Sequence, residues 1–214
     1  MVGLVGIYGG TFDPIHLGHV NAAREVQKAL AMDEVRLVLS ARPPHRVQPK
    51  LSAEKRFALL KLALTKEANL IADNSELLRS GPSYMVDTLA DLRQQKPLFS
   101  LALIMGIEAF NGITKWYNWE QLLDLAHIVV TDRAGFDNKL NDAVKDLVLA
   151  RQTFDKKQLK KVTHGKIYRQ NVTPLAISAT EVRALLQQNQ SVSDMLSPDV
   201  WSLIKSKNLY PQVN

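Results

Sequence analysis

The sequence predicts an α/β fold, an open parallel sheet with helices on both faces. Short runs of β-branched and aliphatic residues alternate with longer amphipathic stretches, as in chains built from strand–helix units. The most apolar of the strand-like runs, such as residues 101–105, are continuous, which is typical of strands buried on both faces of a sheet. The chain has 214 residues and carries no internal repeat or low-complexity tract. We therefore expect one domain over residues 1–214.

The expected strands are short and end at clear stop signals. Gly9 and Gly10 end the first strand, and a proline-rich loop follows the second. The expected strands comprise residues 4–8, 35–39, 100–105, 127–131, 166–169 and 172–175.

The expected helices carry apolar residues at helical spacing, and several of them begin after a serine. Ser52 and Ser83 are predicted N-caps. The last two helices form a C-terminal helical part, residues 176–214. The expected helices comprise residues 17–31, 53–66, 84–95, 138–151, 179–188 and 198–207.

The composition excludes several kinds of site. Because the chain has no cysteine, it has no disulfide, thiolate nucleophile or iron–sulfur cluster. Its apolar runs are shorter than the roughly 20 residues that a membrane helix needs. The first residues lack the basic region and cleavage site of a secretory signal. We therefore expect a cytoplasmic protein with no membrane partner.

The positive charge of the chain is concentrated in one segment. Residues 155–166 hold five lysines and one aspartate, which is +4 of the net +6. Such a segment is usually a solvated face, and otherwise it attracts a phosphorylated small molecule or nucleic acid. No aromatic residues are interleaved with these lysines, so we expect no nucleic-acid partner.

Polar residues follow several of the expected strands. Open parallel sheets bind their ligands beyond the carboxyl ends of the strands, near the point where the strand order reverses. The segments at this edge are residues 9–19, 43–46, 106–108 and 132–133.

Residues 9–19 have the features of a phosphate site. Gly9 and Gly10 let a ligand approach the backbone closely. His16 and His19 stand at the start of the next helix, where free N–H groups and the helix dipole attract an anion. Either histidine alone is more simply a helix-start residue, but the whole string is too specific to be an ordinary turn.

Residues 177–183 form a second candidate anion site. Ser178 and Glu181 fit a capping box, so an ordinary helix start explains them equally well. Arg183 is a cation early in the helix, where the dipole opposes it. An anion bound at this helix start would reverse that penalty.

Residues 115–119 contain two of the three tryptophans. Such a cluster most often anchors a core or an interface. Alternatively, an exposed tryptophan stacks on a flat substrate ring, and the residues alone leave both readings open.

These strings carry a family resemblance. Residues 9–19 closely resemble the GGTFDPxHxGH signature of nucleotidyltransferases, and residues 177–183 resemble their ISxTxxR signature. The Trp116 segment, with residues 43–46 and 82–84, narrows the resemblance to bacterial nicotinate-nucleotide adenylyltransferases. The likeness extends from about residue 4 to residue 210, and it implies a Rossmann-like nucleotidyltransferase fold.

The resemblance implies an activity and assigns roles. Such an enzyme moves AMP from ATP to the 5′-phosphate of nicotinate mononucleotide and releases pyrophosphate. The catalytic residues implied are His16, His19 and Arg183. The ATP-binding residues implied are Gly9, Gly10, Thr11, Phe12, His16, Gly18, His19, Gly106, Glu108, Arg133, Ile177, Ser178 and Arg183. The residues implied at the other substrate are His45, Arg46, Ser83, Tyr84, Met85, Trp116 and Tyr117.

Within these roles, Trp116 would stack on the nicotinate ring, and backbone N–H groups near Met85 and Tyr117 would receive its carboxylate. Two positions depart from the family pattern. Glu108 stands where Asp is usual, and Met85 stands where many members have Thr.

Mg²⁺ is the expected cofactor. It would bridge the ATP phosphates without a protein cage, and we expect no other metal. A homo-oligomer is possible. Two alternatives stay open: a sister transferase for nicotinamide mononucleotide or phosphopantetheine, and a non-catalytic nucleotide- or RNA-binding module.

Overall fold

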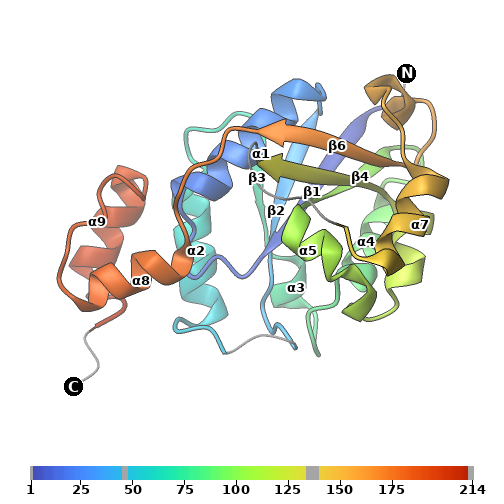
Figure 1. Cartoon of the computed structure of the whole chain (residues 1–214). Helices are drawn as coiled ribbons and strands as arrows, with labels where there is room; N and C mark the ends of the chain where they lie inside the picture. Colours follow the sequence, from blue (N-terminus) through green and yellow to red (C-terminus); the bar gives the residue numbers. More distant parts are fainter. Residues whose placement is uncertain (1, 45–47, 134–139, 212–214) are drawn as a thin grey trace.

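The computed structural model describes residues 2–44, 48–133 and 140–211. Its centre is a six-stranded sheet in which every neighbouring pair of strands is parallel, in the order β3-β2-β1-β4-β5-β6. The predicted α/β class is confirmed, with helices on both faces of the sheet (Figure 1). The strands are β1 Leu4–Gly10, β2 Glu34–Leu39, β3 Leu70–Asp73, β4 Ser100–Gly106, β5 His127–Arg133 and β6 Ile167–Val172.

The helices connect successive strands and then close the chain. The α-helices are α1 Leu17–Ala29, α2 Ala53–Ala63, α3 Ser75–Leu78, α4 Met85–Gln95, α5 Ile107–Asn111, α6 Leu122–Leu125, α7 Asp142–Arg151, α8 Ala179–Gln187 and α9 Pro198–Ser206. Short 3₁₀ turns cover Ile113–Lys115, Trp119–Gln121 and Lys156–Lys160. Within the described ranges, no helix is long and apolar enough to cross a membrane.

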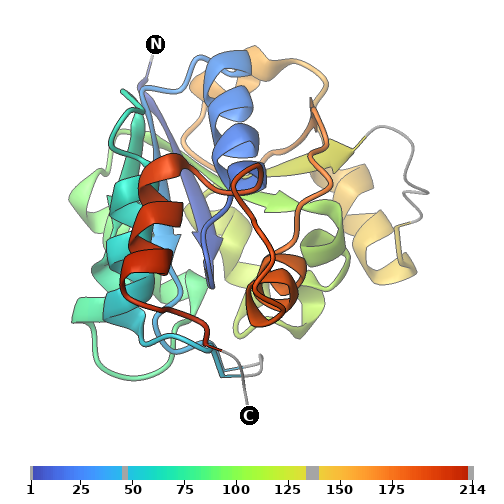
Figure 2. The same ribbon diagram turned by 90° about the vertical axis from the view of Figure 1, so that its left-hand side faces the viewer.

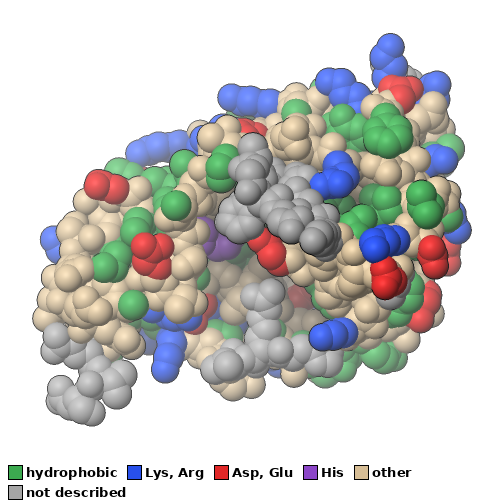
Figure 3. Space-filling view, viewed as in Figure 1, with side chains coloured by type: hydrophobic (Ala, Val, Ile, Leu, Met, Phe, Trp, Pro, Cys, Tyr) green, Lys and Arg blue, Asp and Glu red, His purple; other side chains and the backbone are tan. Residues whose placement is uncertain are grey.

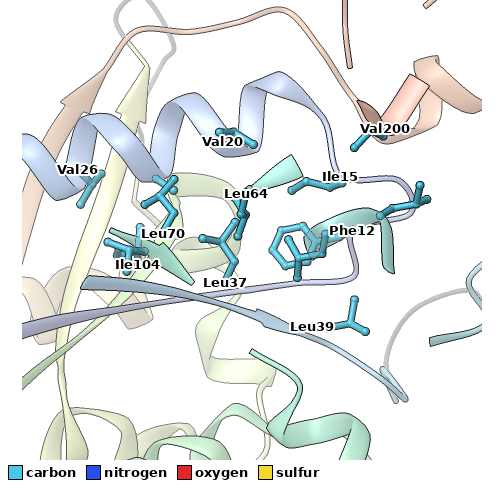
Figure 4. Packing of buried hydrophobic residues seen from close by; sticks show 14 of the residues in the cluster. Phe12, Ile15, Val20, Val26, Leu37, Leu39, Leu64, Leu70, Ile104 and Val200 are labelled. Atoms are coloured by element: carbon cyan, nitrogen blue, oxygen red, sulfur yellow. The ribbon is translucent and has the colours of Figure 1, made fainter. Parts of the chain in front are cut away.

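The sheet separates two hydrophobic clusters. Side chains alternate along β4, so that Ile104 joins the cluster under α1 and α2, while Leu103 joins the cluster under α4. The loop between β1 and α1 comprises residues 11–16 and follows Gly9 and Gly10, and we call it the glycine-rich loop. It belongs to the first cluster. Figure 4 shows its Phe12 and Ile15 beside Leu39 of β2 and Val200 of α9. The core therefore fixes the glycine-rich loop against both the sheet and the C-terminal part.

The C-terminal helices lie along one side of the molecule. Helix α9 packs against α2, and α8 lies beside the carboxyl ends of the strands (Figures 1 and 2). The N–H group of Leu17, at the start of α1, donates to the carbonyl of Met195 at 2.9 Å. The C-terminal part is thus attached directly to the glycine-rich loop.

Two expectations about strands were wrong. In place of the two expected strands 166–169 and 172–175 there is one strand, β6 Ile167–Val172, and the chain leaves the sheet after Val172. Strand β3 was missed. Both lie at the edges of the sheet, where only one long side is paired. The sequence IYRQNV of β6 is interrupted by polar residues, so it lacks the apolar run that marks a central strand. Strand β3 has the sequence LIAD and is only four residues long, which leaves a weak signal.

One predicted cap was also wrong. Ser52 caps α2 and accepts from the N–H of Lys55 at 3.4 Å. By contrast, α4 begins after Tyr84, and the Ser83 hydroxyl oxygen accepts from the N–H of Arg42 at 2.9 Å. The Ser83 N–H donates back to the Arg42 carbonyl at 3.0 Å, so this pair joins two loops instead of capping a helix.

Candidate active site

A cleft of about 1010 Å³ opens at the carboxyl ends of β1 and β4. The strand order reverses between these two strands, which is where open α/β sheets bind ligands. Figure 3 shows the hollow in the surface, with histidine at its wall. The cleft brings together these residues of the predicted site: Gly9, Gly10, Thr11, Phe12, His16, Gly18, His19, Ser83, Tyr84, Met85, Gly106, Glu108, Trp116, Tyr117, Ile177, Ser178 and Arg183.

The side chains of three predicted site residues lie outside the part of the chain that the structure describes. His45 and Arg46 lie outside the described residues. Arg133 ends β5, and the structure describes its backbone but not its side chain.

The two histidines stand side by side at the start of α1. Their rings are stacked, with centroids 3.6 Å apart and planes inclined by 27°. The His16 N–H points to His19 Nδ1 at 3.4 Å, and the Phe12 ring meets His19 edge-on at 5.1 Å. When Nδ1 accepts, the proton of the neutral His19 ring is on Nε2, which makes Nε2 a donor. A Cβ on Gly18 would lie 3.0 Å from the His16 ring, so a glycine keeps this stack possible.

Arg183 reaches from α8 to the same loop. Its Nη1 donates to the Asp13 carbonyl at 2.7 Å, and its Nη2 donates to the Thr180 hydroxyl at 3.2 Å. Its side chain is 25% exposed, at the wall of the cleft. Ser178 caps α8 by accepting from the Glu181 N–H at 3.1 Å, as predicted. The starts of α1 and α8 therefore line one cleft, and each brings N–H groups to it.

Aromatic side chains line the cleft beside the core cluster under α4. The Tyr84 and Tyr117 rings are stacked with centroids 4.3 Å apart. Trp116 is half-buried, packs against the core cluster under α4 and lines the cleft. It therefore serves both as a core anchor and as a wall that a flat ring can reach. Met85 at the start of α4 lies over Gly9, where an added Cβ would meet its Cε at 2.4 Å.

Glu108 stands at the rim, in the first turn of α5. Its side chain is exposed and bends back, so that Oε2 would lie 3.1 Å from a Cβ on Gly106. The carboxylate thus stays near the end of β4 despite its extra methylene.

Comparisons with known proteins agree with this geometry. Residues 7–185 match the model of the cytidylyltransferase-like family. The chain is 39% identical over 207 residues to a probable nicotinate-nucleotide adenylyltransferase of Psychromonas ingrahamii, covering 96% of each chain. It is 40% identical to the one of Methylococcus capsulatus, covering 97% of this chain and 99% of the relative. The chain belongs to the nicotinate-nucleotide adenylyltransferases of the cytidylyltransferase-like family.

A solved structure shares the fold of this adenylyltransferase. It is nicotinic acid mononucleotide adenylyltransferase of Plasmodium falciparum complexed with NaAD, with a TM-score of 0.73 and 18% identity over 97% of both chains. At 18% identity, the match shows that the two chains share a fold.

The structure of this family member also shows residues that sequence reasoning missed. Arg56 of α2 is 1% exposed and donates to four backbone carbonyls. Burial lowers the pKa of this guanidinium. Its acceptors are the carbonyls of Thr11 at 2.7 Å, Ser40 at 2.8 Å, Ala41 at 2.9 Å and Leu51 at 3.1 Å. A sequence signal existed, because Arg56 precedes the buried Leu60 by four residues and so shares its helix face.

Asp13, Glu76 and Tyr210 were missed as well. Asp13 and Glu76 line the cleft although both are buried, at 6% and 3% exposure. Burial raises the pKa of the Glu76 carboxyl, which accepts from the Thr88 hydroxyl at 2.8 Å. The Tyr210 hydroxyl donates to Asp13 Oδ1 at 2.7 Å. Nothing in the sequence marks Glu76 or Tyr210, since their partners come from distant segments.

No group of three or more His, Cys, Asp or Glu side chains suited to a metal ion occurs in the part of the chain that the structure describes. The carboxylates at the cleft are Asp13, Glu76 and Glu108, and they come from three different loops or helices.

Proposed function

We propose that this chain transfers the adenylyl group of ATP to the 5′-phosphate of nicotinate mononucleotide, which yields nicotinate adenine dinucleotide and pyrophosphate. The observation that carries the proposal is the continuity of one cleft. The same cleft is lined by His16, His19 and Arg183 and by Trp116 and Tyr117. A dinucleotide product likewise combines phosphates, which the two histidines and the arginine would bind, with a pyridine ring, which the aromatic residues would bind.

The reaction needs positioned charge and no covalent intermediate. An oxygen of the mononucleotide phosphate attacks the α-phosphorus of ATP, and the bond from that phosphorus to the bridging oxygen breaks as pyrophosphate leaves. The attacking phosphate is already ionised near neutral pH, so no general base is required. Catalysis then consists of holding the reactants in line and stabilising the charge on the phosphate oxygens.

His19 and Arg183 act on different phosphates of ATP in this proposal. The Nε2–H of His19 donates to the α-phosphate, and His16 supports it through the stacked ring contact. The Arg183 guanidinium attracts the departing β- and γ-phosphates from the start of α8. Because the first N–H groups of α1 and α8 also carry partial positive charge, both helix starts favour a bound triphosphate.

The aromatic residues of the cleft and the start of α4 bind the second substrate in this proposal. The Trp116 ring stacks on the nicotinate ring, and the first N–H groups of α4, beginning at Met85, donate to its carboxylate. A carboxylate accepts from two N–H groups, whereas a carboxamide offers only one oxygen. This difference underlies the preference that we propose for the acid over the amide.

Mg²⁺ fits this site as a companion of ATP. The Asp13 carboxylate oxygens accept from Tyr210 and from the backbone, and Glu108 lies at the rim, so the wall next to the phosphates is made of donors rather than a carboxylate cage. Mg²⁺ is commonly held by substrate phosphates with few protein ligands, where it neutralises phosphate charge. We propose the same here.

We propose small molecules as the partners of the chain and the cytoplasm as its location. A nucleic-acid partner is not needed for the proposed reaction, and neither is a second copy, because every residue invoked comes from one chain.

The role of His19 has a direct test. His19→Ala removes the proposed donor to the α-phosphate, and we expect turnover to fall by about 100-fold or more, the size typical of a lost transition-state donor. His19 is only half-buried, so the midpoint of thermal unfolding should change little. Steady-state pyrophosphate release and a thermal melt measure the two quantities. Turnover near that of the wild type would contradict the assignment.

A further inference from the structure

Asp13 is a buried carboxylate at the wall of the cleft, and several segments donate to it. Its Oδ2 accepts from the Lys50 N–H at 2.7 Å, and its Oδ1 accepts from the Leu51 N–H at 3.4 Å. Arg183 Nη1 lies 4.0 Å from Oδ2, a loose ion pair, while the same nitrogen bonds the Asp13 carbonyl at 2.7 Å. Asp13 is therefore the nearest anion to the arginine that we assign to the triphosphate.

The remaining strong donor to Asp13 comes from the last residues of the chain. Tyr210 follows α9 and is 5% exposed, and its hydroxyl donates to Asp13 Oδ1 at 2.7 Å. Burial and the Asp13 charge raise the pKa of this phenol, so it remains a donor. Among the described residues, those lining the cleft include Asp13 but not Tyr210. The tyrosine thus acts from behind the wall and does not touch a ligand.

The donors to Asp13 affect how strongly its carboxylate attracts the Arg183 guanidinium. A carboxylate with few donors and an arginine 4.0 Å away would close into a tight pair, and the guanidinium would then be engaged by Asp13 instead of by an incoming anion. The Tyr210 hydroxyl and the backbone N–H groups satisfy the carboxylate and fix its rotation. Arg183 consequently keeps its longer contact and stays available to an incoming anion.

We propose that Tyr210 is a positioning residue for ATP: by holding Asp13, it keeps Arg183 turned toward the triphosphate. The proposal rests on the function proposed above, because it assumes that Arg183 contacts the ATP phosphates. In this proposal the C-terminal part contributes to the active site, because Tyr210 contacts Asp13 although the two residues are 197 positions apart in the chain.

The test replaces the hydroxyl and keeps the ring. Tyr210→Phe should raise the KM for ATP by about tenfold, the effect of one hydrogen bond to a charged group, while kcat and the KM for nicotinate mononucleotide stay within about twofold. In an Arg183→Ala background, Tyr210→Phe should have no further effect on the KM for ATP. This non-additivity identifies action through Arg183, which general destabilisation cannot produce.

Ser100→Ala is the matched control. Its hydroxyl also donates in the core, to Leu159 and Val162 carbonyls, but at the opposite end of β4. It should lower the unfolding midpoint as Tyr210→Phe does and leave both KM values unchanged, at a temperature where all variants are folded. An unchanged KM for ATP in Tyr210→Phe, the same change in Ser100→Ala, or full additivity with Arg183→Ala would overturn the proposal.

A second readout separates this proposal from the proposed function. Calorimetric binding of MgATP needs no turnover. If the wild type failed to turn over nicotinate mononucleotide but bound MgATP about tenfold more tightly than Tyr210→Phe, the reaction assignment would fail and the positioning role would stand. Equal binding by both proteins would overturn the positioning role whatever the activity.

Discussion

His127 is a fully buried histidine that joins two segments at the amino ends of the strands. Its Nδ1 accepts from the Lys166 N–H at 3.0 Å, and its Nε2 lies 3.0 Å from the Val162 carbonyl. The neutral tautomer with its proton on Nε2 satisfies both contacts. Burial lowers the pKa of this ring to about 4, because a charged imidazolium would lose its hydration.

This shift predicts a loss of stability in mild acid. The unfolded chain binds a proton at His127 below about pH 6.5, whereas the folded chain resists it, so stability falls as the pH drops from 6.5 toward 4. Between pH 7 and pH 5, this one group should lower the free energy of unfolding by roughly 2 kcal/mol. Urea titrations of the wild type and of His127→Gln measure the effect. If both proteins lose the same free energy over this range, the account of His127 is wrong.

Single residues also show where sequence reasoning succeeds and where it stops. The placement of His16, His19 and Arg183 at one cleft was predictable, because short motifs at strand and helix boundaries mark these residues. Asp13 was visible in its motif but had no assigned role. Tyr210 was not predictable, since its partner lies 197 positions away and only folding brings the two together.

At the scale of elements, α2 acts as an anchor for the loops of the active site. Its Arg56 joins the carbonyl of Thr11 in the glycine-rich loop to those of Ser40 and Ala41 after β2. A helix that packs against the sheet and α9 thereby fixes the loops that line the cleft.

Removing this guanidinium should be costly. Arg56→Met keeps much of the length but leaves four backbone carbonyls, those of Ala41 and Leu51 in fully buried contacts, without this donor. We therefore expect a loss of about 3 kcal/mol or more in the free energy of unfolding. Lys55→Met on the exposed side of the same helix is the control, with an expected change within about 0.5 kcal/mol. Denaturant titration measures both. A loss below about 1 kcal/mol in Arg56→Met would show that water or other donors replace the side chain.

The elements predicted best are those with a single dominant signal. Central strands such as β4 read as apolar runs, and α8 begins at the serine that the capping pattern indicates. Strand β3 was missed because it is only four residues long, and β6 was divided because polar residues interrupt its sequence IYRQNV. Ser83 was misread because its hydroxyl oxygen accepts from the Arg42 N–H across a loop. Local patterns do not encode such tertiary contacts.

At the scale of the whole molecule, the lysine-rich segment serves the fold. Lys156 Nζ donates to the Ala29 carbonyl at 2.9 Å, and Lys160 Nζ donates to the Ala31 carbonyl at 2.6 Å. Cations at the C-terminal end of α1 satisfy its last carbonyls and oppose the negative end of its dipole. This contact explains two of the lysines without a nucleic-acid partner.

The whole chain contributes to one cleft. The glycine-rich loop comes from its beginning, the aromatic wall from its middle, and Ser178 and Arg183 from its C-terminal part. We propose that this cleft joins ATP to a mononucleotide that carries a pyridine carboxylate.

Pyrophosphate release from MgATP, measured in parallel with nicotinate mononucleotide and nicotinamide mononucleotide, tests that claim most directly. We predict rapid release with the acid and little with the amide, because α4 begins with N–H groups that a carboxylate satisfies better. Comparable rates with both would contradict carboxylate recognition. No release with either substrate would contradict the proposed reaction. It would favour a transferase that acts on phosphopantetheine, or a module that binds ATP and catalyses no reaction.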